Sequence, residues 1–209
     1  MKRFRWLWLL PVLTPVVVLA LLSSPFFVGA QAGPGGWMLT TTLDNPISTY
    51  GATYASFNPA TTPTELACLT GYTGSTIRVK RFIVTAYSST AGSMDLVLLK
   101  RTTATTGGTS SAPTIAKYDS TQGAPVGVFT VYRATPTVGT GVALRDELLN
   151  FGLAGAAGKT SFDFATANDK PLLLKATTES ACINLAGVAL PGTTGARVAI
   201  EVEWQESTP

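Results

Sequence analysis

The sequence predicts an all-β fold, either an antiparallel β-sandwich or a jelly-roll-like barrel of about eight to ten strands, after an apolar N-terminal leader. Three observations support this prediction. After residue 33, no long stretch shows the 3.6-residue hydrophobic period of an amphipathic helix. Short runs of β-branched and apolar residues alternate with clusters of Gly, Pro, Ser and Thr. Residues 197–205 alternate strictly between apolar and polar side chains, which indicates a strand with one face on the core.

Residues 1–32 have the pattern of a secretory signal peptide. Three cations precede an apolar stretch over residues 6–22, and the Ala-Gln-Ala of residues 30–32 supplies the small side chains that signal peptidase requires. An uncleaved membrane anchor is the alternative, because the stretch approaches the roughly 20 residues that span a bilayer. Two prolines within the stretch favour cleavage. We expect a single β-sandwich domain over residues 33–209, with membrane contact only through residues 1–32 if they are retained.

The composition narrows the range of functions. The chain contains no histidine, which excludes Ser-His-Asp and Cys-His catalysis and histidine metal sites. Lys2, Arg3 and Arg5 account for the whole excess of 15 basic over 12 acidic residues, so the body of the chain is neutral. A neutral body gives no electrostatic reason to expect nucleic-acid binding. We therefore expect a non-enzymatic protein without catalytic, cofactor-binding or metal-binding residues.

The strand over residues 197–205 provides the predicted core residues. Four apolar side chains share one face and are expected to pack in the core: Val198, Ile200, Val202 and Trp204. For Trp204, this means a core residue rather than a platform for a ligand. Glu201 and Glu203 lie on the opposite face, which predicts a solvated face rather than a pair of catalytic carboxylates.

Residues 76–87 form the longest predicted strand, and their pattern changes phase in the middle. Ile77 and Val79 share one face, whereas Phe82 and Val84 lie on that same face only if the alternation switches at Lys80-Arg81. Such a switch predicts a β-bulge there, or two strands joined at a bend.

The next strand is predicted over residues 93–101. It carries apolar side chains on both faces, which indicates a strand buried on both sides. Residues 88–92 (SSTAG) lie between these two strands and predict a hairpin-type loop.

Further elements are less regular. Residues 102–113 are rich in Thr, Ser and Gly and predict a surface loop. Residues 142–151 place Leu144, Leu148 and Phe151 at helical spacing, which favours a short helix over an irregular strand. Four more strands are predicted, the last two joined by a tight connection: residues 126–133, 160–166, 171–177 and 180–188.

The chain contains two cysteines, Cys68 and Cys182, and both lie in apolar surroundings. In an oxidising compartment they can form a disulfide that closes a loop of 114 residues. Loop-closure entropy assigns roughly 4–5 kcal/mol to such a bridge. The alternative is two buried free thiols that pack as small apolar side chains.

Three stretches of the sequence resemble tailed-phage virion structural proteins of the small β-sandwich decoration or tail-associated type. They are residues 74–86 continuing to 95–101, residues 118–135, and residues 171–204 ending in the Ile-Glu-Val-Glu-Trp of residues 200–204. The resemblance implies a structural or assembly protein that contacts copies of itself or a shell, usually as a homo-oligomer, with no active-site residues.

Two alternatives stay open at this point. The leader favours a secreted or surface-attached bacterial binding module, similar to an adhesin domain, in an extracellular or cell-surface location. A secreted hydrolase using carboxylates alone is the third hypothesis, although no close carboxylate pair in a loop indicates one.

Overall fold

The computed structural model describes residues 31–32, 38–39, 47–59, 64–151, 154–164, 171–186 and 196–207. The chain divides into two units, Met1–Pro46 and Ile47–Pro209. In the first unit, strands β1 (Gln31–Ala32) and β2 (Met38–Leu39) form an antiparallel pair. The predicted leader lies outside the described residues, apart from its last two. Within the described ranges, no helix has the length and hydropathy needed to cross a membrane.

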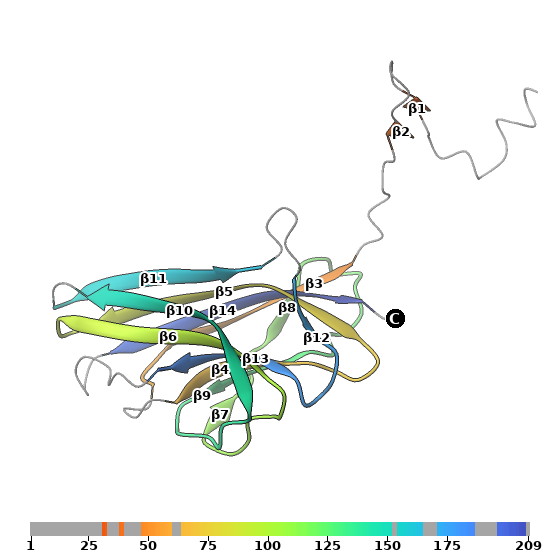
Figure 1. Ribbon diagram of the computed structural model, residues 1–209. Helices are drawn as coiled ribbons and strands as arrows, with labels where there is room; N and C mark the ends of the chain where they lie inside the picture. The colour runs from red at the N-terminus through yellow and green to blue at the C-terminus, as the bar shows by residue number, and fades with distance from the viewer. Residues whose placement is uncertain are drawn as a thin grey trace, which may run out of the picture. The chain divides into compact units, whose positions relative to one another are not determined.

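The second unit is a sandwich of two antiparallel sheets that do not close into a barrel (Figure 1). The predicted β-sandwich is confirmed, and the barrel alternative is wrong. We name each sheet after a central strand. In order across it, the β13 sheet contains β10 (Gly141–Phe151), β6 (Gly92–Arg101), β13 (Ser180–Leu185), β4 (Glu65–Thr70), β9 (Val128–Tyr132) and β7 (Ser110–Ser111).

The β14 sheet forms the other layer. In order across it, this sheet contains β11 (Ala156–Asp163), β5 (Thr76–Ser88), β14 (Arg197–Ser207), β3 (Ser48–Phe57) and β8 (Ile115–Lys117), while β12 (Leu172–Leu174) also pairs with β5. Within the described ranges, nine strands of this unit have five or more residues and three are shorter, against the eight to ten expected. Four strands of this unit, β3, β4, β7 and β8, were not predicted, and β7 lies within the predicted loop over residues 102–113.

The core lies between the inward faces of the two sheets. All four core residues predicted on β14 have an exposed fraction of 0%: Val198, Ile200, Val202 and Trp204. The prediction of a solvated opposite face is wrong for Glu203, whose exposed fraction is 7%. Lys80 and Arg81 on β5 reach across this face and contact the Glu203 carboxylate at 3.0 and 2.9 Å, and their side chains cover it.

The β-bulge predicted in the longest strand is confirmed. In the pairing of β14 with β5, Glu203 is opposite Arg81 and Trp204 is opposite Val79, so Lys80 is the extra residue. The bulge shifts the alternation by one residue, and Ile77, Val79, Phe82 and Val84 all face the core. The strand is continuous from Thr76 to Ser88, so the alternative of two strands joined at a bend is wrong.

The predicted hairpin between β5 and β6 is wrong. β5 pairs with β11, β12 and β14, whereas β6 pairs with β10 and β13 in the other sheet. The short loop therefore crosses from one layer to the other. The tight connection before β13 behaves in the same way, because β12 pairs with β5. A short turn in the sequence shows that two strands are consecutive, but it does not show that they pair with each other. In both connections, the two consecutive strands form their hydrogen bonds with other strands, in different sheets.

The helix favoured over residues 142–151 is also wrong, because this segment is strand β10. It pairs with β6 along its whole length, with a bulge at Leu144 between the pairs Ala143–Leu99 and Arg145–Leu98. The bulge interrupts the alternation, and the leucines consequently mimic helical spacing. Only the end of β10 reaches the core, where Leu149 and Phe151 are buried.

Candidate functional site

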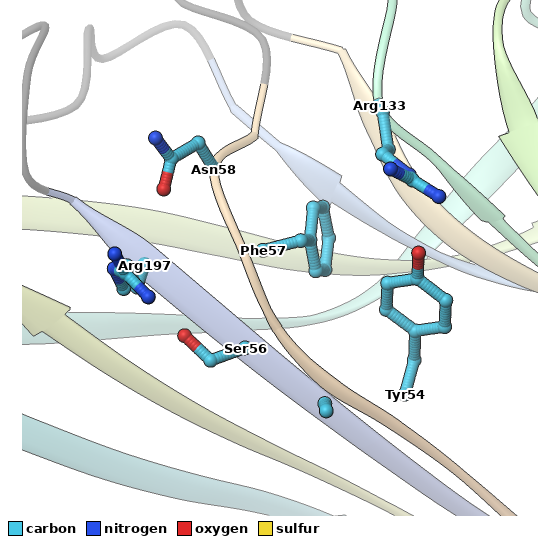
Figure 2. Close-up of a pocket in the computed structure, with 7 residues that line it drawn as sticks. Tyr54, Ser56, Phe57, Asn58, Arg133 and Arg197 are labelled. Carbon is cyan, nitrogen blue, oxygen red and sulfur yellow. The ribbon is translucent and has the colours of Figure 1, made fainter.

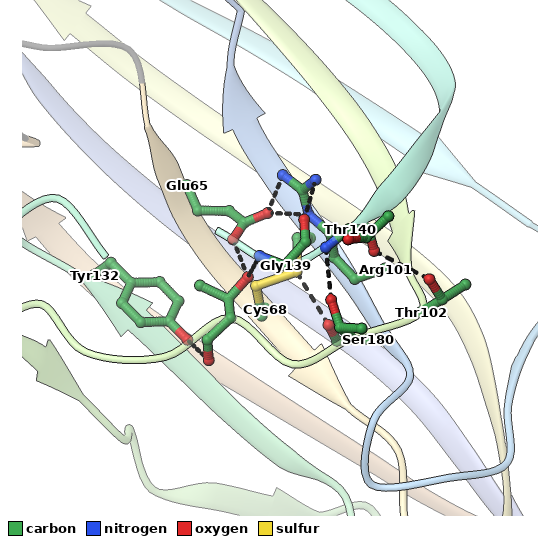
Figure 3. A network of polar contacts seen from close by, with 11 residues as sticks. Glu65, Cys68, Arg101, Thr102, Tyr132, Gly139, Thr140 and Ser180 are labelled. Carbon is green, nitrogen blue, oxygen red and sulfur yellow. Dashed lines mark hydrogen bonds and ion pairs between the residues drawn. A yellow bond between two sulfur atoms is a disulfide. The ribbon is translucent and has the colours of Figure 1, made fainter. Parts of the chain in front are cut away.

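The outer face of the β13 sheet carries a buried polar network (Figure 3). Glu65 is fully buried, and its Oε1 accepts a hydrogen bond from Arg101 Nε at 2.6 Å. Thr105 Oγ1 donates to the other carboxylate oxygen, and Arg101 Nη1 donates to the Gly139 carbonyl at 2.8 Å. Thr105 and Gly139 belong to the loops after β6 and β9, so these loops lie over this face. The loop predicted over residues 102–113 is thus a cover anchored by a buried ion pair.

The same cover hides the disulfide between Cys68 and Cys182, which confirms the predicted bridge. The two cysteines are direct partners in the pairing of β4 with β13, with their Cα atoms 4.1 Å apart. Their neighbours along each strand face the core, so both sulfurs point outward, where they pack with Tyr132. Burial, followed by the negative charge of Glu65, raises the pKa of Tyr132.

The arrangement of Glu65, Cys68 and Cys182 superficially resembles a metal site. Their ligand atoms lie within 4.8 Å of one another. The two sulfurs are bonded to each other, however, and both carboxylate oxygens already accept hydrogen bonds. Because a metal requires free thiolates and free lone pairs, this cluster stabilises the fold rather than holding an ion.

A second buried carboxylate also has a structural role. Glu206 accepts hydrogen bonds from Trp204 Nε1 at 2.7 Å, from the Gly127 amide at 2.8 Å and from the Val126 amide at 2.9 Å. A Cβ added at Gly127 would lie 2.8 Å from Ile77 Cδ1 and 3.0 Å from Glu206 Oε1, so a larger residue would displace these side chains. The carboxylate fixes the segment before β9 against the end of β14.

The structure brings together a carboxylate pair that the sequence did not indicate. Asp95 on β6 and Asp146 on β10 share a hydrogen bond on the outer face of the β13 sheet. That hydrogen bond, followed by burial and the repulsion from Asp146, raises the pKa of Asp95. Glycosidase carboxylates are separated by about 5 Å or more so that substrate or water fits between them. Two carboxyl groups in direct contact on an open sheet face do not provide that geometry.

The most accessible candidate site is an open hollow of about 570 Å³ at one end of the sandwich (Figure 2). Tyr54 and Phe57 line it from the end of β3, where a bulge displaces the strand between the pairs Tyr54–Ile200 and Phe57–Val198. Asn58 follows β3, Arg133 follows β9 and Arg197 begins β14. The hollow is therefore built from both sheets, where strands end and loops begin.

Two aromatic rings and two guanidinium groups shape the hollow. Tyr54 and Phe57 pack edge to face with ring centroids 5.4 Å apart. The Arg133 guanidinium carbon lies 5.7 Å from the Tyr54 ring centroid, and its Nη2 donates to Ser111 Oγ at 2.8 Å. Arg197 and Asn58 are exposed at the rim. The arrangement presents positive charge beside an apolar floor, which is suited to binding rather than to proton transfer.

Sequence reasoning found the cysteines and the β14 core, but it missed every residue of this hollow. Arg133 is the last residue of the strand predicted over residues 126–133, and Arg197 is the first residue of the strand predicted over residues 197–205. One signal was available: residues 120–144 and 180–200 each contain a single charged residue, which is Arg133 in the first and Arg197 in the second. Their convergence depends on the pairing of strands that are far apart in the chain.

Comparisons with models of protein families, with curated proteins and with solved structures found no match to this chain. The resemblance to tailed-phage virion proteins consequently stays a prediction.

Proposed function

We propose that this chain is a non-enzymatic exported β-sandwich module that acts by binding at its surface. The observation that carries the proposal is the buried Cys68–Cys182 disulfide. It joins the neighbouring strands β4 and β13, which are far apart in the sequence. Structural disulfides persist in oxidising compartments and are rare in the cytosol. The bridge and the signal-like leader therefore support the same location.

The sheet edges support a module that does not polymerise by adding strands. The edge strand β10 is interrupted by the bulge at Leu144, after which Arg145 and Glu147 lie on the inward side of the sheet. Bulges and inward charges are devices that block edge-to-edge pairing. The edges β7 and β8 have two and three residues, and the edge β11 carries the exposed Lys159. Each outer strand therefore resists pairing with another chain.

The test is the thiol state of the chain in the cell. Whole cells are quenched with acid, the full chain is alkylated under denaturing conditions, and its mass is measured before and after reduction. We expect no alkylation before reduction and two alkyl groups after it. A Cys68→Ala/Cys182→Ala variant, which cannot gain mass, is the matched control. Two alkylated cysteines in unreduced material would contradict the export proposal.

A structural or assembly protein, as the virion resemblance implies, is the second candidate. It is favoured by exposed apolar side chains on β10: Val142 at 67%, Leu148 at 62% and Leu144 at 44%. Exposed apolar groups of this kind mark protein contacts when they are contiguous. The native mass of the full chain decides between the two candidates. An oligomer that dissociates in a Leu148→Lys variant would favour assembly, and a monomer would favour the binding module.

A further inference from the structure

The hollow formed by Tyr54, Phe57, Asn58, Arg133 and Arg197 is a site for an anionic ligand, and we propose that it binds the carboxylate or sulfate group of an acidic saccharide. The proposal rests on the proposed function, because a secreted binding module needs a ligand site. Its volume of about 570 Å³ lies in the range of small-ligand sites, roughly 300–1,000 Å³.

The charge around the hollow has one sign. The lining contains two arginines and no carboxylate. Residues 45–64 carry no charged side chain, and Arg133 and Arg197 are the only charged residues within 120–144 and 180–200. These three segments therefore contribute no negative charge, and the first carboxylate on β14 is Glu201, four residues after Arg197. An anion that enters the hollow meets two cations and no repelling carboxylate from these segments.

Four cations of the domain have carboxylate partners. Lys80 and Arg81 pair with Glu203, Lys100 pairs with Glu179, and Arg101 pairs with Glu65. Within the described ranges, neither Arg133 nor Arg197 forms an ion pair. The guanidinium group is a planar fork of donors that matches carboxylate and sulfate oxygens. The two groups therefore keep donors for a ligand anion.

Arg133 is held in place before any ligand arrives. Its backbone amide donates to the Thr109 carbonyl at 2.8 Å, and its side chain is fixed by Ser111 and by the Tyr54 ring. A pre-oriented group loses less entropy on binding. The Arg197 side chain is exposed and, within the described residues, forms no ion pair. One fixed and one exposed cation suit an anionic group on a chain or ring of variable structure.

The remaining lining favours a saccharide over a simple inorganic anion. The half-buried Tyr54 ring, backed by the buried Phe57, offers apolar surface for the C–H face of a sugar ring, while the Asn58 amide offers a donor and an acceptor for hydroxyl groups. The neutral body of the chain disfavours nucleic acid, whose binding depends on extended positive charge.

The proposal is tested by calorimetric titration of the oxidised full chain with trigalacturonic acid and with a sulfated heparin disaccharide. Neutral galactotriose, sodium sulfate and a single-stranded oligonucleotide are the comparison ligands. We expect binding of at least one acidic sugar, with galactotriose and sulfate at least about tenfold weaker. Arg133→Gln and Arg197→Gln should each weaken that binding about tenfold or more, since each removes charged hydrogen bonds.

Arg78→Gln is the matched control, because Arg78 is opposite Gln205 at the far end of β14 and should leave affinity unchanged. Melting temperature and non-reducing mass verify that each variant is folded. No binding of either acidic sugar, equal binding of sulfate or galactotriose, or equal loss in the Arg78 variant would overturn the proposal, as would tighter binding of the oligonucleotide. These outcomes are independent of where the chain is located in the cell, so they are distinguishable from failure of the export proposal.

Discussion

Arginine has opposite roles in two regions of this molecule. Under the loops of the β13 sheet, Arg101 has an exposed fraction of 7% and is bonded to Glu65 and to the Gly139 carbonyl. At the end of the sandwich, Arg197 is exposed, and among the described residues the Arg133 side chain contacts a hydroxyl group and an aromatic ring but no carboxylate. A buried cation must be paired for the fold to be stable, whereas an unpaired exposed cation keeps its donors for a ligand. The first region therefore stabilises the fold, and the second is available for recognition.

The largest expected effect tests the covered region. Reduction of the Cys68–Cys182 bridge should lower the free energy of unfolding by about 4–5 kcal/mol, because it releases a loop of 114 residues in the unfolded chain. Urea unfolding with and without reductant measures the difference. The Cys68→Ala/Cys182→Ala variant is the control and should not respond to reductant. An unchanged midpoint for the native chain would show that the bridge contributes little.

Loss of the buried carboxylate should have the next largest effect. Glu65→Gln leaves Arg101 buried without a counter-ion and should cost about 3–5 kcal/mol of unfolding free energy. Chemical denaturation measures the change. Glu147→Gln replaces an exposed carboxylate on β10 and should change stability by less than about 0.5 kcal/mol. Similar losses in both variants would remove the distinction between covered and open charges.

The Asp95–Asp146 pair should produce a smaller, pH-dependent effect. The raised pKa means that folded Asp95 holds its proton more tightly than unfolded Asp95. Its stabilising contribution is therefore full below the ordinary pKa of 3.8 and is lost as the pH rises through the higher folded pKa. Asp146→Asn removes the repulsion between the carboxylates and should raise stability at pH 7 by a few tenths of a kcal/mol (~0.2–1).

The difference in stability between the Asp146→Asn variant and the native chain should become smaller as the pH falls toward 4. Melting temperatures across pH 4–7 measure it. A gap that is constant with pH would mean that the two carboxyl groups do not interact in solution.

The smallest effect is expected at the hollow. Arg197→Gln should change the free energy of unfolding by less than about 0.5 kcal/mol, since the side chain is exposed and has no ion pair within the described residues. Arg133→Gln should cost about 0.5–1 kcal/mol more, because it loses the Tyr54 and Ser111 contacts. Thermal unfolding of both variants measures these values. A loss near that of Glu65→Gln would place the two arginines among the structural residues.

Local patterns predicted those features that depend on neighbouring residues. The alternation of residues 197–205 predicted the inward face of β14, because successive side chains of a strand point to opposite sides. The phase change at Lys80 predicted the bulge of β5 for the same reason. The candidate site was beyond this reasoning, because Arg133 and Arg197 are 64 positions apart, and Arg133 follows a strand of one sheet whereas Arg197 begins a strand of the other.

The sequence alone was sufficient for the all-β class, the buried face of β14, a break in the alternation of β5 and two cysteines in apolar surroundings. The tertiary structure alone decided that β5 and β6 belong to different sheets, that residues 141–151 are a strand, and that Cys68 is opposite Cys182. It also decided that a Thr-rich loop covers Glu65. The physical reason is that side-chain alternation is a local property of the backbone. Strand pairing, by contrast, depends on which apolar faces pack against each other, and these faces come from segments that are far apart in the chain.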